Sequence, residues 1–274
     1  MIKKITFSDI NNMPDEWAYN VPGITLYKNK SINFTEGVNV LVGPNGSGKS
    51  TIIRTIAKYY FCWDTGLTKF TNSAARDLIN SYNDCMLKDG MKIISDGCVS
   101  YMGEKLFNGN TDIERSFGMD FEGFKEVYNL KNSSTGETSC RSFTQSLDKI
   151  YEFDFHNNLK TIVERKFSNW ETTKLGIIYL KNGYNNLKRY IKKDNSYRRP
   201  TILIDEVDSH MDILNTIYGT KILVEQVSKF FQIIIATHNP LIYTFDNINF
   251  IELEKDYNNK IQKELLQFGI KMNL

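Results

Sequence analysis

The sequence predicts an α/β fold with a mostly parallel central sheet, an antiparallel N-terminal β layer and an inserted helical subdomain. Short apolar runs of the kind buried on both faces of a parallel sheet lie at 38–42, 201–204 and 231–236. From 110 to 195 the chain is instead polar, dotted with aromatic residues and mostly helical in pattern. We therefore expect a sheet-based core, interrupted by a helical insertion.

The first elements follow one another closely. β-forming residues cluster at 2–7 and 24–34, so three strands are expected before the first helix, counting the run at 38–42. Apolar residues then recur at helical spacing from 49 to 61. Farther on, Asp96-Gly97 favours a type I′ turn and predicts a hairpin over 91–107.

The late elements complete the core. Residues 212–229 read as a helix that crosses between the two late strands, residues 248–254 as a further strand and residues 260–268 as an amphipathic helix. We expect the core to comprise residues 1–109 and 196–274, and the helical subdomain to comprise residues 110–195.

Composition excludes several classes of protein. The 274 residues are 41% hydrophobic and 24% charged, with a net charge of +2, so the whole molecule has no field strong enough to indicate nucleic acid or an acidic membrane. Four widely spaced cysteines suggest neither a zinc site nor a disulfide framework. No apolar window reaches the length of a membrane span. We expect a cytoplasmic protein without membrane insertion.

A glycine-rich loop between the third strand and the first helix matches G-x-x-x-x-G-K-[ST]. Its backbone N–H groups and the following helix N-terminus suit phosphate, which predicts ATP with Mg²⁺. Lys49 would contact the β- and γ-phosphates, the Ser50 hydroxyl would bind Mg²⁺ and Thr51 would contact the α-phosphate. The predicted nucleotide-binding residues are Gly43, Pro44, Asn45, Gly46, Ser47, Gly48, Lys49, Ser50 and Thr51.

Two later strands end in polar residues suited to the same chemistry. Asp205 and Glu206 close the apolar run ILIDE, where Asp205 would hold Mg²⁺ and Glu206 would orient the water that attacks the γ-phosphate. His238 ends the run IIIATH. Each signal is weak alone, but the three agree in order along the chain. Lys49, Glu206 and His238 are therefore the candidate catalytic residues.

These motifs resemble the P-loop NTPases of the ABC ATPase superfamily, in the soluble branch of RecF and SMC heads and small stand-alone bacterial AAA-type ABC ATPases. The resemblance covers residues 1–60 and 200–255. It implies that ATP is sandwiched between two subunits, with Ser209–Asp212 at their interface and His238 sensing the γ-phosphate. It also implies hydrolysis of ATP and water to ADP and phosphate.

The signature motif expected of this family has two candidates. Ser134, Gly136 and Glu137 in SSTGETS have the chemistry to bind a γ-phosphate but lie far before Asp205. The segment 180–191 has nearly the usual spacing but lacks the serine. We favour Ser134, Gly136 and Glu137. Glu104 stands where the resemblance expects a glutamine that contacts Mg²⁺.

The sequence admits three functions. The first is an ATPase switch, as in DNA repair or phage defence, in which ATP drives formation of a homodimer or engagement of an effector subunit. The others are the nucleotide-binding subunit of a transporter and an ATP sensor with little turnover. Nucleic acid stays a possible partner because cations gather at 181–199, although a solvated helix face is the preferred interpretation there.

Overall fold

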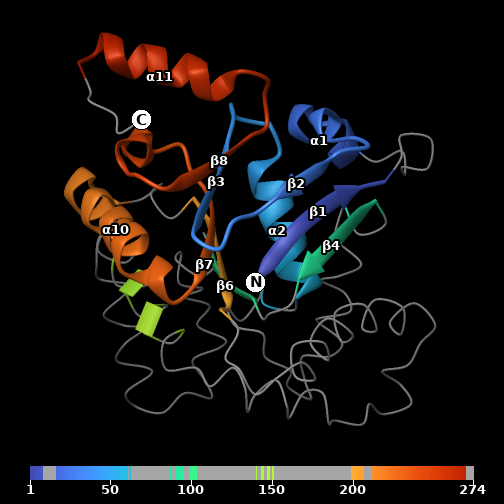
Figure 1. The fold of residues 1–274 in the computed structure, drawn as a ribbon, viewed down its shortest axis with the longest axis horizontal. Helices are drawn as coiled ribbons and strands as arrows, with labels where there is room; N and C mark the ends of the chain where they lie inside the picture. The colour runs from blue at the N-terminus through green and yellow to red at the C-terminus, as the bar shows by residue number, and fades with distance from the viewer. Residues whose placement is uncertain are drawn as a thin grey trace, which may run out of the picture.

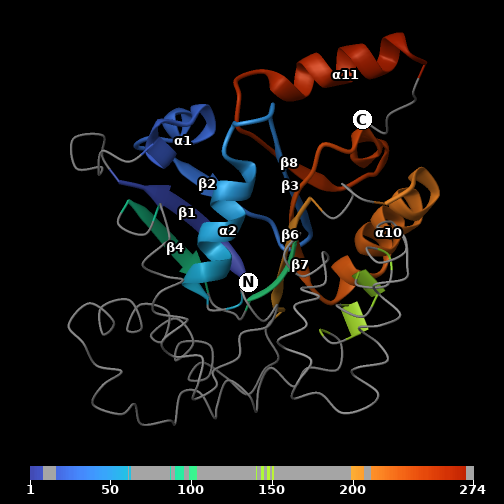
Figure 2. The ribbon, with the colours of Figure 1, turned by 180° about the vertical axis from the view of Figure 1, so that it is seen from behind.

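The computed structural model describes residues 1–8, 17–60, 62, 87, 90–95, 99–103, 140, 143–144, 147–148, 150, 199–206 and 211–269. The described residues form layers in space: helix α2 (Lys49–Tyr59) lies between an antiparallel sheet and a parallel sheet (Figure 1). Helices α10 (Ile213–Glu225) and α11 (Tyr257–Gln267) pack beyond the parallel sheet, as the view from behind also shows (Figure 2).

The parallel sheet carries the apolar runs. Its order is β5-β6-β7-β3-β8, and each neighbouring pair is parallel. The strands are β3 (Val38–Val42), β5 (Val99–Gly103), β6 (Thr201–Asp205), β7 (Gln232–Ala236) and β8 (Ile248–Glu252). All five residues of β3, β5, β6 and β7 are buried. The predicted α/β fold with a parallel sheet is confirmed.

Alternating side chains of this sheet fill two cores. Leu41, Leu203 and Ile234 face α2 and the antiparallel sheet. Val40, Ile204 and Ile235 face the other way, toward α10 and η5 (Val227–Lys229). Because successive strand residues point to opposite faces, one run of apolar residues supplies both cores. The sheet is thereby fixed from both sides, and so are the loops at its carboxyl end.

The antiparallel sheet has the order β2-β1-β4, with β1 (Ile2–Phe7), β2 (Ser31–Asn33) and β4 (Met91–Ser95). The hairpin expected over 91–107 is wrong, because β4 pairs with β1 while β5 pairs with β6 in the other sheet. Burial alternates along β4 but is continuous along β5. The alternating strand suits a sheet with one solvated face, and the buried strand suits a central sheet.

The strand expected over 24–34 is also wrong in its first half. Residues Pro22–Leu26 form the short helix α1, which follows the 3₁₀ turn η2 (Trp17–Asn20), and only Ser31–Asn33 pair as a strand. Pro22 begins α1, a position where its fixed φ and missing N–H are tolerated. Local chain stiffness and tertiary packing here override the β-propensity of Ile24, Thr25 and Tyr27.

The other predicted elements are present. The helix after the glycine-rich loop is α2, the crossover helix is α10 with η5, the further strand is β8 and the amphipathic helix is α11. The 3₁₀ turn η6 (Pro240–Thr244) follows β7. Most of the predicted helical subdomain lies outside the described residues. Of that segment, Phe143, Leu147 and Ile150 are helical and buried in the core beside α10. Within the described ranges, no helix is long and apolar enough to cross a membrane.

A buried glutamine joins the two sheets at the amino end of β7. Gln232 Oε1 accepts hydrogen bonds from Ile2 N and Thr201 Oγ1, both at 2.7 Å. Gln232 Nε2 donates to Ile2 O and Thr35 O, also at 2.7 Å. A buried amide is tolerated where its polar atoms have partners. The antiparallel sheet is therefore held in register against the sheet that carries the site.

Candidate nucleotide site

The glycine-rich loop joins β3 to α2 and turns through two left-handed residues. Gly46 and Gly48 have φ values of +76° and +100°, which residues with a Cβ atom adopt only with strain. Gly48 is also the N-cap of α2, so Lys49, Ser50 and Thr51 occupy the first turn of that helix. First-turn N–H groups have no partner within their helix and suit an anion.

Lys49 folds back over this loop. Its Nζ donates to Gly43 O at 2.9 Å and to Pro44 O at 3.1 Å, and the side chain is 3% exposed. Burial lowers the pKa of Lys49 below its ordinary value, and the negative charges of Glu206 and Asp205 partly oppose that shift. The ammonium therefore stands among carbonyls and near two carboxylates, ready to pair with a more strongly negative group such as a phosphate.

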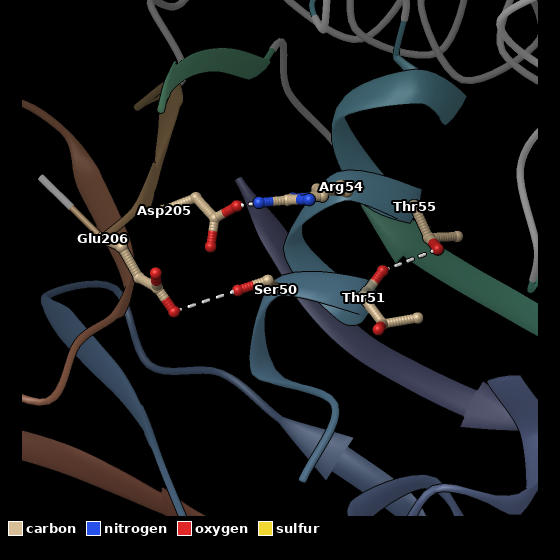
Figure 3. Close-up of polar contacts among 6 residues, drawn as sticks. All are labelled: Ser50, Thr51, Arg54, Thr55, Asp205 and Glu206. Atoms are coloured by element: carbon tan, nitrogen blue, oxygen red, sulfur yellow. Dashed lines mark hydrogen bonds and ion pairs between the residues drawn. The ribbon is translucent and has the colours of Figure 1, made fainter. Parts of the chain in front are cut away.

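Both predicted carboxylates face α2 because the backbone turns between them. Glu206 N donates to Ala236 O at 3.0 Å, so the ladder with β7 continues past the end of β6. Glu206 has a φ of +54°, a left-handed value that non-glycine residues rarely adopt. Adjacent strand side chains would point to opposite faces. The turn at Glu206 breaks that alternation, and both carboxylates point toward α2 (Figure 3).

Two contacts link the carboxylates to α2. Ser50 Oγ donates to Glu206 Oε1 at 3.4 Å, and Arg54 Nε donates to Asp205 Oδ2 at 2.8 Å (Figure 3). Asp205 is 1% exposed, and its other oxygen, Oδ1, is buried with no hydrogen-bond partner among the described residues. A buried carboxylate oxygen without a partner destabilises the fold unless a ligand binds to it. A cation between Asp205 and Ser50 would do so.

The donor set fits Mg²⁺. Magnesium is commonly held by one or two protein oxygens, with water and substrate phosphates completing its shell. The described residues contain no group of three or more His, Cys, Asp and Glu that could hold a metal without such help. Asp205 and Ser50 are therefore suited to Mg²⁺ that arrives with a nucleotide, as the sequence predicts.

Eight of the predicted residues line one open cleft of about 560 Å³, within the usual size range of ligand sites, whereas Gly43, Pro44, Ser47 and Asp205 are not part of its lining. Its lining consists of Val21, Asn45, Gly46, Gly48, Lys49, Ser50, Thr51, Glu206 and His238. The cleft thus brings the glycine-rich loop together with the ends of β6 and β7, which are far apart in sequence. His238 is exposed on this cleft. The roles of these residues stay predictions.

Helix α1 closes one side of the loop. Gly23 N donates to Ser47 O at 3.0 Å, and the backbones approach so closely that a Cβ on Gly23 would lie 2.3 Å from that oxygen. This contact places Val21 in the cleft wall. Tyr27, from the segment 24–34, lies in no strand; it caps α1 and packs partly buried against the core. Burial raises its pKa, with a further contribution from Glu252.

Several predicted residues lie outside the described part of the chain. They are the signature candidates Ser134, Gly136, Glu137 and 180–191, together with Glu104, Ser209 and His210. Asp212, expected at a subunit interface, is the N-cap of α10 and accepts hydrogen bonds from Leu214 N and Asn215 N. Arg199, from the basic segment, donates to Glu36 O and Lys229 O and so ties two loops together.

Two site residues were missed from the sequence. Arg54 is not one of the buried residues of α2, and it follows Ser50 by four residues, a spacing that puts both on one face. That spacing was the available signal. Val21 carries no comparable signal, because its position depends on the docking of α1 against Ser47.

A known protein family matches most of this chain. Residues 21–268 match the family described as AAA domain. A stretch of 42 residues is 43% identical to a putative ABC transporter ATP-binding protein of Pyrococcus horikoshii, and it covers 15% of this chain and 16% of that protein. The chain thus matches about a sixth of the length of this curated relative.

Solved structures give more distant likenesses. A dimeric ATP-binding cassette bound to ADP and phosphate after hydrolysis aligns over 93% of this chain and 97% of its own, with 15% identity and a TM-score of 0.35. A nucleotide-free cassette from an ABC transporter aligns over 100% of both chains, with 12% identity and a TM-score of 0.38. An SMC head bound to the C-winged helix domain of ScpA covers 88% of this chain and 91% of its own, with 15% identity and a TM-score of 0.34.

Proposed function

Because this chain belongs to the AAA-domain family, we propose that it binds ATP with Mg²⁺ and hydrolyses it, and that ATP binding drives two copies together. The family match confirms the resemblance to AAA-type P-loop ATPases. The observation that carries the proposal is the single cleft in which the glycine-rich loop, Glu206 and His238 meet. A binding loop alone would not need a carboxylate and a histidine from two other strands.

The loop and α2 would bind the phosphates. Backbone N–H groups of the first turn point their partial positive charge at an anion, and Gly46 and Gly48 allow that backbone to curve around it. Lys49 would exchange its bonds to Gly43 O and Pro44 O for bonds to the β- and γ-phosphates. Thr51 would contact the α-phosphate.

Asp205 and Ser50 would hold Mg²⁺, which neutralises charge on the phosphate oxygens during phosphoryl transfer. The buried Asp205 Oδ1 supports this assignment, because a bound cation would satisfy it. Binding of the metal would also draw Ser50 Oγ away from Glu206 Oε1, 3.4 Å distant, and leave that carboxylate able to accept a proton or a hydrogen bond.

Glu206 would orient the attacking water and accept its proton, with His238 contacting the γ-phosphate from the end of β7. The left-handed backbone at Glu206 supports this role, because it directs the carboxylate toward Ser50, a proposed Mg²⁺ ligand on α2 (Figure 3). Rare backbone conformations are retained where the position of a side chain matters. The signature motif of a second copy would close this open cleft, and Ser134, Gly136 and Glu137 stay the favoured residues for it.

Phosphate release and binding of a fluorescent ATP analogue test the proposal on the full chain. Glu206→Gln is expected to bind ATP normally and to lower turnover by about 100-fold or more, the usual contribution of a general base. Lys49→Ala should lose nucleotide affinity. Lys58→Ala, one turn beyond Arg54 on α2, is the matched control and should change neither turnover nor nucleotide affinity. Equal phosphate release by wild type and Glu206→Gln, with nucleotide bound in both, would show that the chain is not an ATPase of this mechanism.

A further inference from the structure

Arg54 makes a contact that the proposed roles leave unexplained. It lies on α2 one turn after Ser50, and its Nε donates to Asp205 Oδ2 at 2.8 Å. The Arg54 side chain is 42% exposed, whereas that of Asp205 is 1% exposed. Figure 3 shows the Arg54 guanidinium reaching one Asp205 oxygen from α2, while the other oxygen points away from Arg54, to the side where Ser50 and Glu206 lie.

We propose that Arg54 is a positioning residue: it holds Asp205 Oδ2 so that Oδ1 faces the magnesium position. This inference rests on the proposed function, since it concerns the same metal site. Rotation about the last torsion of an aspartate is soft and nearly two-fold, so packing alone fixes the carboxylate plane poorly. A charge-assisted hydrogen bond to one oxygen fixes that plane and reserves the other oxygen for the metal.

The charge of Arg54 could in principle act in the opposite sense, by repelling Mg²⁺. The exposures of the Arg54 and Asp205 side chains decide whether orientation of the carboxylate or repulsion of Mg²⁺ is the larger effect. A half-exposed guanidinium is screened by water, which weakens its repulsion of a nearby cation. Asp205 is buried, so its orientation depends on the few groups that touch it. Loss of Arg54 should therefore weaken metal binding, and a lysine that keeps the donor should largely preserve it.

The test measures how much Mg²⁺ improves nucleotide affinity. Affinity for a fluorescent ATP analogue would be determined for the full chain in EDTA and in excess Mg²⁺, and the ratio of the two dissociation constants taken. For Arg54→Gln we expect this ratio to fall roughly 5- to 10-fold, the scale of one charge-assisted hydrogen bond that is partly screened. Affinity in EDTA should stay within about 2-fold.

Three further variants make the result specific. Arg54→Lys should keep most of the ratio, because its ammonium can still reach Asp205. Lys58→Gln removes a cation from the next turn of α2 and should change nothing. Asp205→Asn should abolish most of the Mg²⁺ effect. Circular dichroism and the unfolding midpoint of each variant check that the fold is retained.

An unchanged ratio in Arg54→Gln, with Asp205→Asn reduced, would overturn the role of Arg54 and leave the proposed function standing. A loss of affinity that is equal in EDTA and Mg²⁺ would also overturn it, because the defect would then lie in phosphate binding or in folding. If neither the wild type nor Asp205→Asn responds to Mg²⁺, the metal assignment itself is wrong, and the positioning role falls with it.

Discussion

Substitution of Gly23 by alanine should separate α1 from the glycine-rich loop. The new Cβ would lie 2.3 Å from Ser47 O and 2.7 Å from Leu253 Cβ, whereas real Cβ contacts essentially never fall below 3.0 Å. Helix α1 and the loop carbonyl must therefore move apart by at least 0.7 Å, the difference between the first and last of these distances. A movement of that size stretches the 3.0 Å bond from Gly23 N to Ser47 O beyond hydrogen-bond range.

The expected loss of stability follows from two effects. Overpacking of a well-packed site costs about 1–3 kcal/mol. The broken hydrogen bond adds about 1 kcal/mol. The free energy of unfolding of Gly23→Ala should therefore fall by about 2–4 kcal/mol. Affinity for the fluorescent ATP analogue should fall as well, because Val21 leaves the cleft wall and Ser47 moves with the loop.

Urea unfolding followed by circular dichroism measures this change, with Gly37→Ala as the matched control. A Cβ on Gly37 meets nothing within 4 Å, so that variant should lie within about 0.5 kcal/mol of the wild type. Equal midpoints for the two variants, at equal slopes of the unfolding transition, would mean that α1 is not held against the loop by this contact.

Three further outcomes are expected. Gln232→Leu removes the amide partner of the buried Ile2 N–H and C=O, and should lower the free energy of unfolding, measured in urea, by about 2–4 kcal/mol. A loss below about 1 kcal/mol would mean that Gln232 does not hold the two sheets together. Glu206→Val should be less stable than Glu206→Asn by about 1–2 kcal/mol in the same assay, because asparagine tolerates the left-handed backbone and a β-branched residue does not; equal stabilities would contradict the strain. Burial lowers the pKa of Lys49 from its ordinary 10.5, so just below pH 10.5 the unfolded chain binds more protons than the folded chain. The wild type should therefore gain stability relative to Lys49→Met as pH rises from about 7 toward 10.5. A flat or opposite trend would contradict the lowered pKa of Lys49.

The sequence predicted most of the parallel sheet because its strands are distinctive. Continuous apolar runs such as 202–204 and 233–236 have few alternatives to a sheet buried on both faces. The loop motif then placed Lys49 and Ser50, and the order of the later strands brought Glu206 and His238 to the same edge. Their placement together was predictable because these residues occur at the ends of strands whose neighbours are determined by the fold, and their chemical roles stay predictions.

The errors have a common physical origin. Asp96-Gly97 favours a tight turn, but whether the flanking strands pair depends on sheets that form over a distance of about a hundred residues in the chain, as β5 does with β6. The residues of α1 have β-propensity, yet Pro22 and the contact of Gly23 with Ser47 select a helix. Arg54 was overlooked because its partner, Asp205, is distant in sequence. Such tertiary choices leave no local pattern.

ATP should drive two copies of this chain together, and the solution mass of Glu206→Gln measures that assembly. Light scattering would be recorded with and without ATP and Mg²⁺, since loss of the base should trap any ATP-bound pair. We expect the 31.8-kDa mass to double only when ATP and Mg²⁺ are present. An unchanged mass, with ATP binding confirmed on the same sample, would contradict it.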